Sequence, residues 1–205
     1  MTDGRTQRLI IGISGASGIV YGIRLLQLLR NMPVETHLVM TRAAEIALAH
    51  ESDCKVAEVR ALADVCYGIN DIGAALSSGS YRTAGMIVAP CSIRSMSEIA
   101  TGVTSTLLTR AADVTLKERR RLLLMVRESP LHTGHLRTMT ALSEMGAIIA
   151  PPVPAFYAKP DTIEDKVDHT VGRALDLFDI DVGVVGRWGE QPELRSRGAK
   201  REELS

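Results

Sequence analysis

The chain has 205 residues, of which 45% are hydrophobic, 23% charged and 3% aromatic, and this composition is typical of a single soluble domain with a sizeable core. Basic and acidic side chains number 24 each, and with so few aromatic rings this balance argues against nucleic acid or an anionic membrane as a partner. The polar start holds no signal-peptide core, no apolar run could span a bilayer, and three scattered cysteines form no disulfide framework, so we expect a cytoplasmic protein.

The first predicted strand, residues 8–14, runs into a glycine-punctuated turn and then into a helix over residues 18–29. Free backbone N–H groups and a helix N-terminus meet at such a turn, which makes it an anion site. The glycines are spaced as G-x-x-G-x-x-G, which is neither the G-x-G-x-x-G of dinucleotide folds nor a P-loop, because no G-K-[ST] follows. We expect a phosphate here, although a purely structural turn remains an alternative. Ser17 adds a hydroxyl that either caps the helix or meets a ligand.

Strand and helix patterns alternate along the rest of the chain. Apolar runs of the buried-strand type are found at 37–41, 85–90, 121–127 and 147–151. Helical patterns are found at 42–50, 56–65, 104–118, 132–145 and 162–177, with one more helix after the polar turn 91–95 and a Gly/Ser-rich loop at 73–80. This alternation predicts an α/β fold with a mostly parallel sheet covered on both faces. We expect a polar arm over 1–7, one domain over 8–185 and a polar tail over 186–205.

The turns at the carboxyl ends of the predicted strands point to the kind of ligand. In open α/β sheets ligands bind beyond these ends. The turns at 14–18, 41–42, 90–95, 127–128 and 151–157 are rich in hydroxyl and basic groups, which suits a phosphorylated ligand. The second strand ends in Thr41 and Arg42, whereas a nicotinamide dinucleotide normally needs a carboxylate there for its ribose. A phosphorylated ligand other than a dinucleotide is therefore favoured.

These turns also carry an ordered set of motifs. They are G-I-S-G-A-S-G at 12–18, T-H-L-V-M-T at 36–41, S-S-G-S at 77–80, P-C-S at 90–92, T-R-A-A-D-V-T-L-K-E-R at 109–119, V-R-E at 126–128 and P-P-V-P-A-F-Y at 151–157. The set resembles the UbiX-type flavin prenyltransferase family over about residues 8–188, including R-W at 187–188. The resemblance implies a Rossmann-like, three-layer flavoprotein fold and a homo-oligomer, typically a dodecamer.

The resemblance also implies a reaction. Such enzymes join the dimethylallyl group of dimethylallyl phosphate to N5 and C6 of reduced FMN without a metal. N5 attacks as phosphate leaves, and the prenyl group then closes onto C6. The product, prenylated FMN, serves a UbiD-type decarboxylase. No metal site is expected, so side chains must supply the positive charge that neutralises the leaving phosphate.

The family match assigns site residues in this sequence. FMN would contact Gly15, Ala16, Ser17, Thr41, Ser92, Ile93, Arg94, Ser95, Arg110 and Arg127. The phosphate of the prenyl donor would be bound by Lys117, Tyr157 and Arg173, which are a point charge, a phenol and a planar fork. Glu128 is expected to transfer a proton and Glu51 to position groups or stabilise charge. Ser17 and Lys117 complete the expected catalytic set.

Each of these residues has an ordinary structural alternative. Glu128 sits at a strand end, where it could cap the following helix. Lys117 and Arg110 could pair with acidic neighbours on a solvated helix face. Tyr157 could fill a core and Arg173 could lie on the surface. Only the ordered motifs favour the functional interpretation of these five residues.

Two other functions remain open on the sequence. One is an FMN-carrying accessory subunit of an aromatic-acid decarboxylase, which activity of the isolated chain on reduced FMN would exclude. The other is a flavin-dependent cysteine decarboxylase. Those enzymes carry P-x-M-N where this chain reads P-C-S-I-R at 90–94.

Overall fold

A computed structural model of the chain describes residues 7–187, so nearly all of the predicted arm (1–7) and tail (186–205) lies outside the described residues. The chain forms two compact units, the first ending at Pro152 and the second starting at Val153. This boundary falls inside the region 8–185 for which the sequence predicts one domain, and the domain assignment stays a prediction. Within residues 7–187 no helix is both long enough and apolar enough to cross a membrane.

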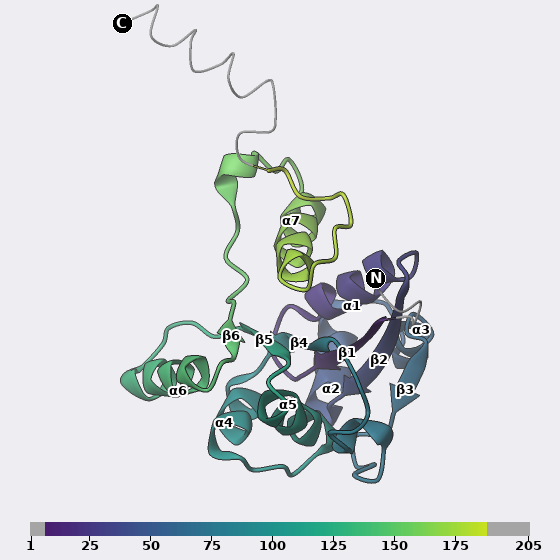
Figure 1. The fold of residues 1–205 in the computed structure, drawn as a ribbon. Coiled ribbons are helices and arrows are strands. Elements are labelled where there is room, and N and C mark those ends of the chain that lie inside the picture. Colours follow the sequence, from purple (N-terminus) through teal and green to yellow (C-terminus); the bar gives the residue numbers. More distant parts are fainter. Residues whose placement is uncertain (1–6, 188–205) are drawn as a thin grey trace, which may run out of the picture. The chain divides into compact units, whose positions relative to one another are not determined.

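Residues 7–152 form a six-stranded sheet with the order β3-β2-β1-β4-β5-β6, in which all neighbouring strands run parallel (Figure 1). Its strands are β1 (Gln7–Ile13), β2 (Val34–Met40), β3 (Val65–Tyr67), β4 (Gly85–Cys91), β5 (Arg121–Val126) and β6 (Ile148–Ile149). The order reverses between β1 and β4, and ligands of open α/β sheets bind at such a switch point. The predicted α/β, Rossmann-like fold is confirmed, with an entirely parallel sheet.

Helices cover both faces of this sheet, as its buried strands require. They are α1 (Ile19–Leu29), α2 (Arg42–Glu51), α3 (Val56–Arg60), α4 (Ile93–Thr101), α5 (Leu107–Lys117) and α6 (Thr133–Glu144). On one face Ile10, Val88 and Leu108 belong to a buried cluster built from strands, α4, α5 and α6. The connection through α1 leads from β1 to β2, on the side of β1 away from β4. A right-handed crossover in this direction places α1 on the other face of the sheet, where it packs against β1 and β4.

The largest departure from the predicted elements concerns residues 56–65. The sequence predicts one helix there, but α3 ends at Arg60 and the chain continues into β3, a three-residue edge strand that pairs with residues 37–39 of β2. Asp64 fixes the start of this strand, since its Oδ2 accepts from the Thr36 backbone nitrogen at 2.7 Å and from the Thr36 hydroxyl at 2.8 Å. A strand of three residues is too short to show a periodic pattern, so only its pairing defines it.

The second unit is built around α7 (Ile163–Asp176). Thr162 begins the helix with a capping box: its hydroxyl accepts from the Asp165 backbone nitrogen at 3.0 Å, and Asp165 Oδ2 accepts from the Thr162 nitrogen at 2.9 Å. The apolar face of the helix, with Val171 and Leu175, is buried. A short 3-10 turn, Phe156–Ala158, precedes it.

Candidate active site

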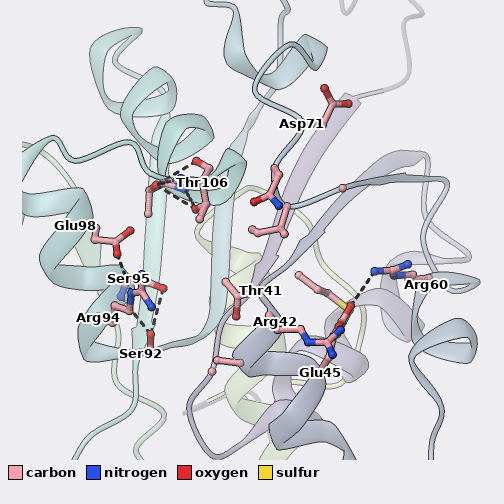
Figure 2. Close-up of a pocket in the computed structure, with 17 residues that line it drawn as sticks. Thr41, Arg42, Glu45, Arg60, Asp71, Ser92, Arg94, Ser95, Glu98 and Thr106 are labelled. Carbon is pink, nitrogen blue, oxygen red and sulfur yellow. Dashed lines mark hydrogen bonds and ion pairs between the residues drawn. The ribbon is translucent and has the colours of Figure 1, made fainter.

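The carboxyl edge of the sheet encloses a cavity of about 620 Å³ (Figure 2). Its walls come from the turns after β1, β2, β3 and β4 and from the amino end of α5. Five of the predicted FMN residues line it, namely Gly15, Thr41, Ser92, Arg94 and Ser95. The volume lies in the range of small-molecule and cofactor sites. The switch point between β1 and β4 is therefore a candidate ligand site.

A buried hydroxyl connects the two strands at the switch point. Ser14 Oγ donates to the Pro90 carbonyl at 2.9 Å and accepts from the Ser92 backbone nitrogen at 2.7 Å. Ser92 then caps α4, because its Oγ accepts from the Ser95 nitrogen at 3.2 Å and lies 3.1 Å from the Ser95 hydroxyl. The end of β1 thus determines where the first turn of α4 presents its hydroxyls to the cavity.

The turn after β1 approaches α2 so closely that only glycine fits. A Cβ atom on Gly15 would lie 2.3 Å from the Cβ of Ala43 and 2.9 Å from its backbone carbon. Thr41 caps α2 by accepting from the Ala44 nitrogen at 3.1 Å. The first turns of α2 and α4 therefore both face the cavity with a capping hydroxyl.

Three arginines on the cavity are held by two carboxylates (Figure 2). Glu45 accepts from Arg60 at 2.8 Å and from Arg42 at 3.4 Å, and Glu98 accepts from Arg94 at 2.9 Å. The hydrogen bond from Ser105 and then the one from Arg94 keep the pKa of Glu98 below its ordinary value, so this carboxylate is ionised at neutral pH. These ion pairs fix guanidinium groups at the cavity, where they are possible hydrogen-bond donors to a ligand.

The helix end that follows β1 already holds an anion of the protein. Glu51 Oε2 accepts from the backbone nitrogens of Gly18 at 2.8 Å and Ile19 at 3.1 Å. The structure thus places a carboxylate where the sequence predicts a phosphate. It also corrects the capping alternative for Ser17: the N-cap of α1 is Gly18, which supplies no side-chain bond, and Ser17 is exposed in the turn beside it.

The predicted residues after β5 lie at the same edge of the sheet but do not line the cavity. Arg127 donates its backbone nitrogen to the Cys91 carbonyl at 3.0 Å, and its guanidinium opposes the upward shift that burial causes in the pKa of Tyr21 on α1. Glu128 is exposed, and its Oε1 accepts from the Ser129 nitrogen at 2.9 Å. Ile93 and Ala16 likewise adjoin the lining residues without lining the cavity themselves.

Lys117 lies at the opposite edge of the sheet. It is the last residue of α5, which runs from the carboxyl ends of the strands back to their amino ends. It pairs with Glu118, and a Cβ atom on Gly79 would lie 2.7 Å from its Nζ. A strand of six or seven residues separates the two edges by about 20 Å. One copy of the chain therefore does not bring Lys117 to the cavity.

Arg110 lies one turn into α5 and faces the loop before β4. Its guanidinium donates to Asp113 at 2.7 Å and to the Ser77 carbonyl at 3.1 Å. It does not line the cavity, although Thr106 and Thr109 from the preceding turn do.

The two remaining predicted phosphate ligands belong to the second unit. The Tyr157 hydroxyl lies 3.4 Å from His169 Nε2, and the two rings meet edge to face. Arg173, one turn further along α7, donates to Asp176 at 2.6 Å, and Asp176 also accepts from Arg187. A phenol, an imidazole and a guanidinium therefore succeed one another along one stretch of this unit.

The sequence did not predict most of the cavity wall that follows β3 and begins α5. Arg42 was placed in a ligand-facing turn without a role, and the lining residues that were given no role are Met40, Ala43, Glu45, Arg60, Gly68, Ile69, Asn70, Asp71, Glu98, Thr106 and Thr109. Four of them follow β3, the strand that the pattern did not predict. The T-x-x-T spacing of Thr106 and Thr109, a capping box that begins α5, was a usable signal.

His132 and Cys91 have structural roles. His132 caps α6 by accepting from the Gly134 nitrogen at 3.0 Å. Complete burial raises the pKa of Cys91 to about 12, which keeps its thiol protonated. Within residues 7–187 no group of three or more His, Cys, Asp or Glu side chains is arranged to hold a metal ion.

Comparisons with known proteins agree with this geometry. The Flavoprotein family profile matches residues 1–176. The flavin prenyltransferase UbiX of Salmonella typhimurium is 60% identical over 175 residues, which cover 85% of this chain and 93% of that protein. The crystal structure of AnUbiX in complex with FMN and dimethylallyl pyrophosphate superposes with a TM-score of 0.90 at 50% identity, covering 91% of this chain and 100% of that one. A dodecameric FMN-dependent UbiX-like decarboxylase from Escherichia coli O157:H7 gives a TM-score of 0.87 at 48% identity, covering 89% and 99%.

Proposed function

The chain belongs to the Flavoprotein family and, within it, to the UbiX flavin prenyltransferases, and from this premise we propose that the cavity at the β1/β4 switch point binds FMN for prenyl transfer. The observation that carries the assignment to the cavity is its lining. The turns that carry the family motifs at Gly15, Thr41 and Ser92 all open into it.

The lining fits the three parts of FMN. Met40 and Ile69 supply apolar surface for a flavin ring. The hydroxyls of Thr41, Ser92 and Ser95 suit a ribityl chain and a phosphate at the first turns of α2 and α4. The arginines paired with Glu45 and Glu98 provide guanidinium hydrogen-bond donors nearby. These residues would hold FMN.

Two acidic residues are proposed to act in the reaction. Reduced FMN supplies the nucleophilic ring positions that accept the dimethylallyl group. Glu51 would keep a negative charge beside the flavin turn, because two backbone N–H groups hold its carboxylate in place. Glu128 would move a proton, since its exposed carboxylate follows β5 at the ligand edge of the sheet and can exchange protons with solvent.

We propose that the phosphate of the prenyl donor is bound between copies of the chain. Lys117 lies at the amino edge of its own sheet, so it can reach a flavin cavity only in a neighbouring copy. Tyr157 and Arg173 would complete the phosphate site. A homo-oligomer is consistent with the dodecameric structure of the E. coli relative. Closed assemblies of this kind bring distant surfaces of identical chains together.

The proposed product is prenylated FMN, which a UbiD-type decarboxylase would use. The test is anaerobic incubation of the isolated protein with reduced FMN and either dimethylallyl phosphate or dimethylallyl pyrophosphate, followed by mass measurement of the flavin. A gain of one dimethylallyl unit is expected. FMN that binds but keeps its mass with both donors would contradict the proposal and favour an FMN-carrying accessory subunit.

A further inference from the structure

A buried histidine outside the cavity contacts both ends of the segment that forms one cavity wall. This wall segment, residues 67–81, leaves the carboxyl end of β3 at Tyr67 and returns to the amino edge of the sheet at Tyr81, shortly before β4. Its residues 68–71 line the cavity. Apart from one 3-10 turn it has no regular structure, so its position depends on side-chain and loop contacts.

The histidine is His37, in the middle of β2. Its Nδ1 lies 2.9 Å from the Tyr67 hydroxyl and its Nε2 3.4 Å from the Tyr81 hydroxyl. The imidazole stacks on the Tyr67 ring at 5.8 Å between centroids and meets the Tyr81 ring edge-on at 5.7 Å. The His37 side chain is only 1% exposed, whereas the two tyrosines are partly buried.

Neighbouring charges determine which ring nitrogen carries the proton. Glu35 Oε1 lies 3.0 Å from Nε2, and a carboxylate only accepts hydrogen bonds, so Nε2 donates to Glu35 and Nδ1 accepts from the Tyr67 hydroxyl. Burial lowers the pKa of His37 despite the opposing effect of Glu35, which favours the neutral ring that this arrangement needs. Arg8 bonds to Glu35 at 3.4 Å and lies 4.7 Å above the Tyr81 ring.

The wall segment also contacts the amino half of α5. The Ile69 carbonyl accepts from the Leu107 nitrogen at 2.8 Å, and the Ser77 carbonyl accepts from the Arg110 guanidinium at 3.1 Å. Leu76 is buried in the core beneath it. A shift of the segment would therefore change the cavity wall and the position of Arg110 together.

We propose that His37 is a positioning residue for the flavin site, which fixes both ends of the wall segment through Tyr67 and Tyr81. The inference rests on the proposed function, because FMN is taken as the ligand of the cavity. His37 is not among the residues that line the cavity. Its effect should therefore fall on the affinity for FMN and not on the rate of prenyl transfer once FMN is bound.

The test uses Tyr67→Phe and Tyr81→Phe, which each remove one hydroxyl from the cluster, together with His37→Gln. FMN affinity is measured by quenching of flavin fluorescence. The rate of prenyl transfer is measured at saturating reduced FMN, and the stability of each variant is measured by thermal unfolding. Loss of the short, partly buried bond to Tyr67 should raise the Kd for FMN about five-fold, with the transfer rate within about two-fold of wild type. Tyr81→Phe should have a smaller effect, because its 3.4 Å contact shares Nε2 with Glu35.

Thr115→Val is the matched control. It removes a hydroxyl that is more deeply buried than those of Tyr67 and Tyr81 and that donates within α5, to the Ala111 carbonyl at 2.7 Å. It should leave the Kd for FMN unchanged. An unchanged Kd in both tyrosine variants, or an equal rise in Thr115→Val, would overturn the positioning role. A wild-type protein that binds FMN without alkylating it would contradict only the proposed function, because affinity is measured independently of transfer.

Discussion

The hydroxyl of Ser14 and the backbone nitrogen of Ser92 are 78 residues apart in sequence and 2.7 Å apart in space. This bond crosses the switch point and fixes the capping residue of α4. Ser14→Ala would leave the partly buried Ser92 nitrogen without this partner, which costs at most the roughly 1–3 kcal/mol of a fully buried donor. The Pro90 carbonyl would keep its second donor, the Ser14 nitrogen at 3.2 Å. We expect lower stability in chemical denaturation and a higher Kd for FMN.

Ser14→Thr is the conservative partner of that variant, since it keeps the hydroxyl. It should retain FMN affinity. If Ser14→Ala bound FMN as tightly as wild type, the bond would be shown not to position the α4 turn.

Gly15→Ala should abolish FMN binding. The added Cβ would overlap Ala43, including its backbone, so the turn after β1 and the start of α2 must move apart. Gly73→Ala is the control, because the nearest atom to its added Cβ is the Asp71 carboxylate oxygen at 3.7 Å, an ordinary contact distance. The Kd for FMN of both variants is measured by flavin fluorescence titration. Tight FMN binding by Gly15→Ala would contradict the inference that Gly15 lies too close to Ala43 for a side chain.

The strand-end turns of β1, β2 and β4 could be predicted because strong local signals mark them. Long buried strands show as apolar runs, and the residues that follow are glycine or hydroxyl-bearing, as at Gly15, Thr41 and Ser92. All three line the cavity. The wall after β3 could not be predicted, since a three-residue edge strand carries no periodicity and its place depends on pairing with β2.

One contact at the ligand edge joins residues so far apart along the chain that no local pattern encodes it. Glu51 reaches the start of α1 from the far end of α2, 33 residues from Gly18. The position of Lys117 was accessible by topology: a helix that follows the carboxyl end of one strand returns to the amino end of the next, so its last residue lies away from the ligand edge.

Glu51 substitutions should separate helix capping from catalysis. Glu51→Gln keeps an oxygen that can accept from the Gly18 and Ile19 nitrogens. The free energy of unfolding should therefore fall by at most about 0.3–1 kcal/mol, because only the charge at the helix end is lost. Glu51→Ala removes the cap and should lower the free energy of unfolding by about 0.5–2 kcal/mol. Prenyl transfer should fall at least ten-fold in both. Wild-type turnover in Glu51→Gln would leave Glu51 with a capping role only.

We expect Asp64 to contribute to the loss of stability at acidic pH. The backbone N–H of Thr36 and its hydroxyl hold the pKa of Asp64 below the ordinary value of 3.8. A depressed folded-state pKa adds stability that is complete above 3.8 and is lost as the pH falls from there through the folded value. Asp64→Asn should lower the thermal midpoint at pH 7 and flatten its decline below about pH 4. Parallel wild-type and variant curves throughout this range would contradict the linkage.

Mixed oligomers test whether the site is shared between copies. Lys117→Met and Glu128→Gln should each be nearly inactive alone, because each removes one member of every site. If the two residues of a site come from different chains, random mixing by co-expression gives about one quarter of sites with both intact. Co-expressed oligomers should then recover about one quarter of the wild-type rate of prenyl transfer, whereas purified variants mixed without reassembly should not. If both residues came from the same chain, every site would lack one of them and no activity would return. Such a result would contradict the proposal that Lys117 acts in a neighbouring copy.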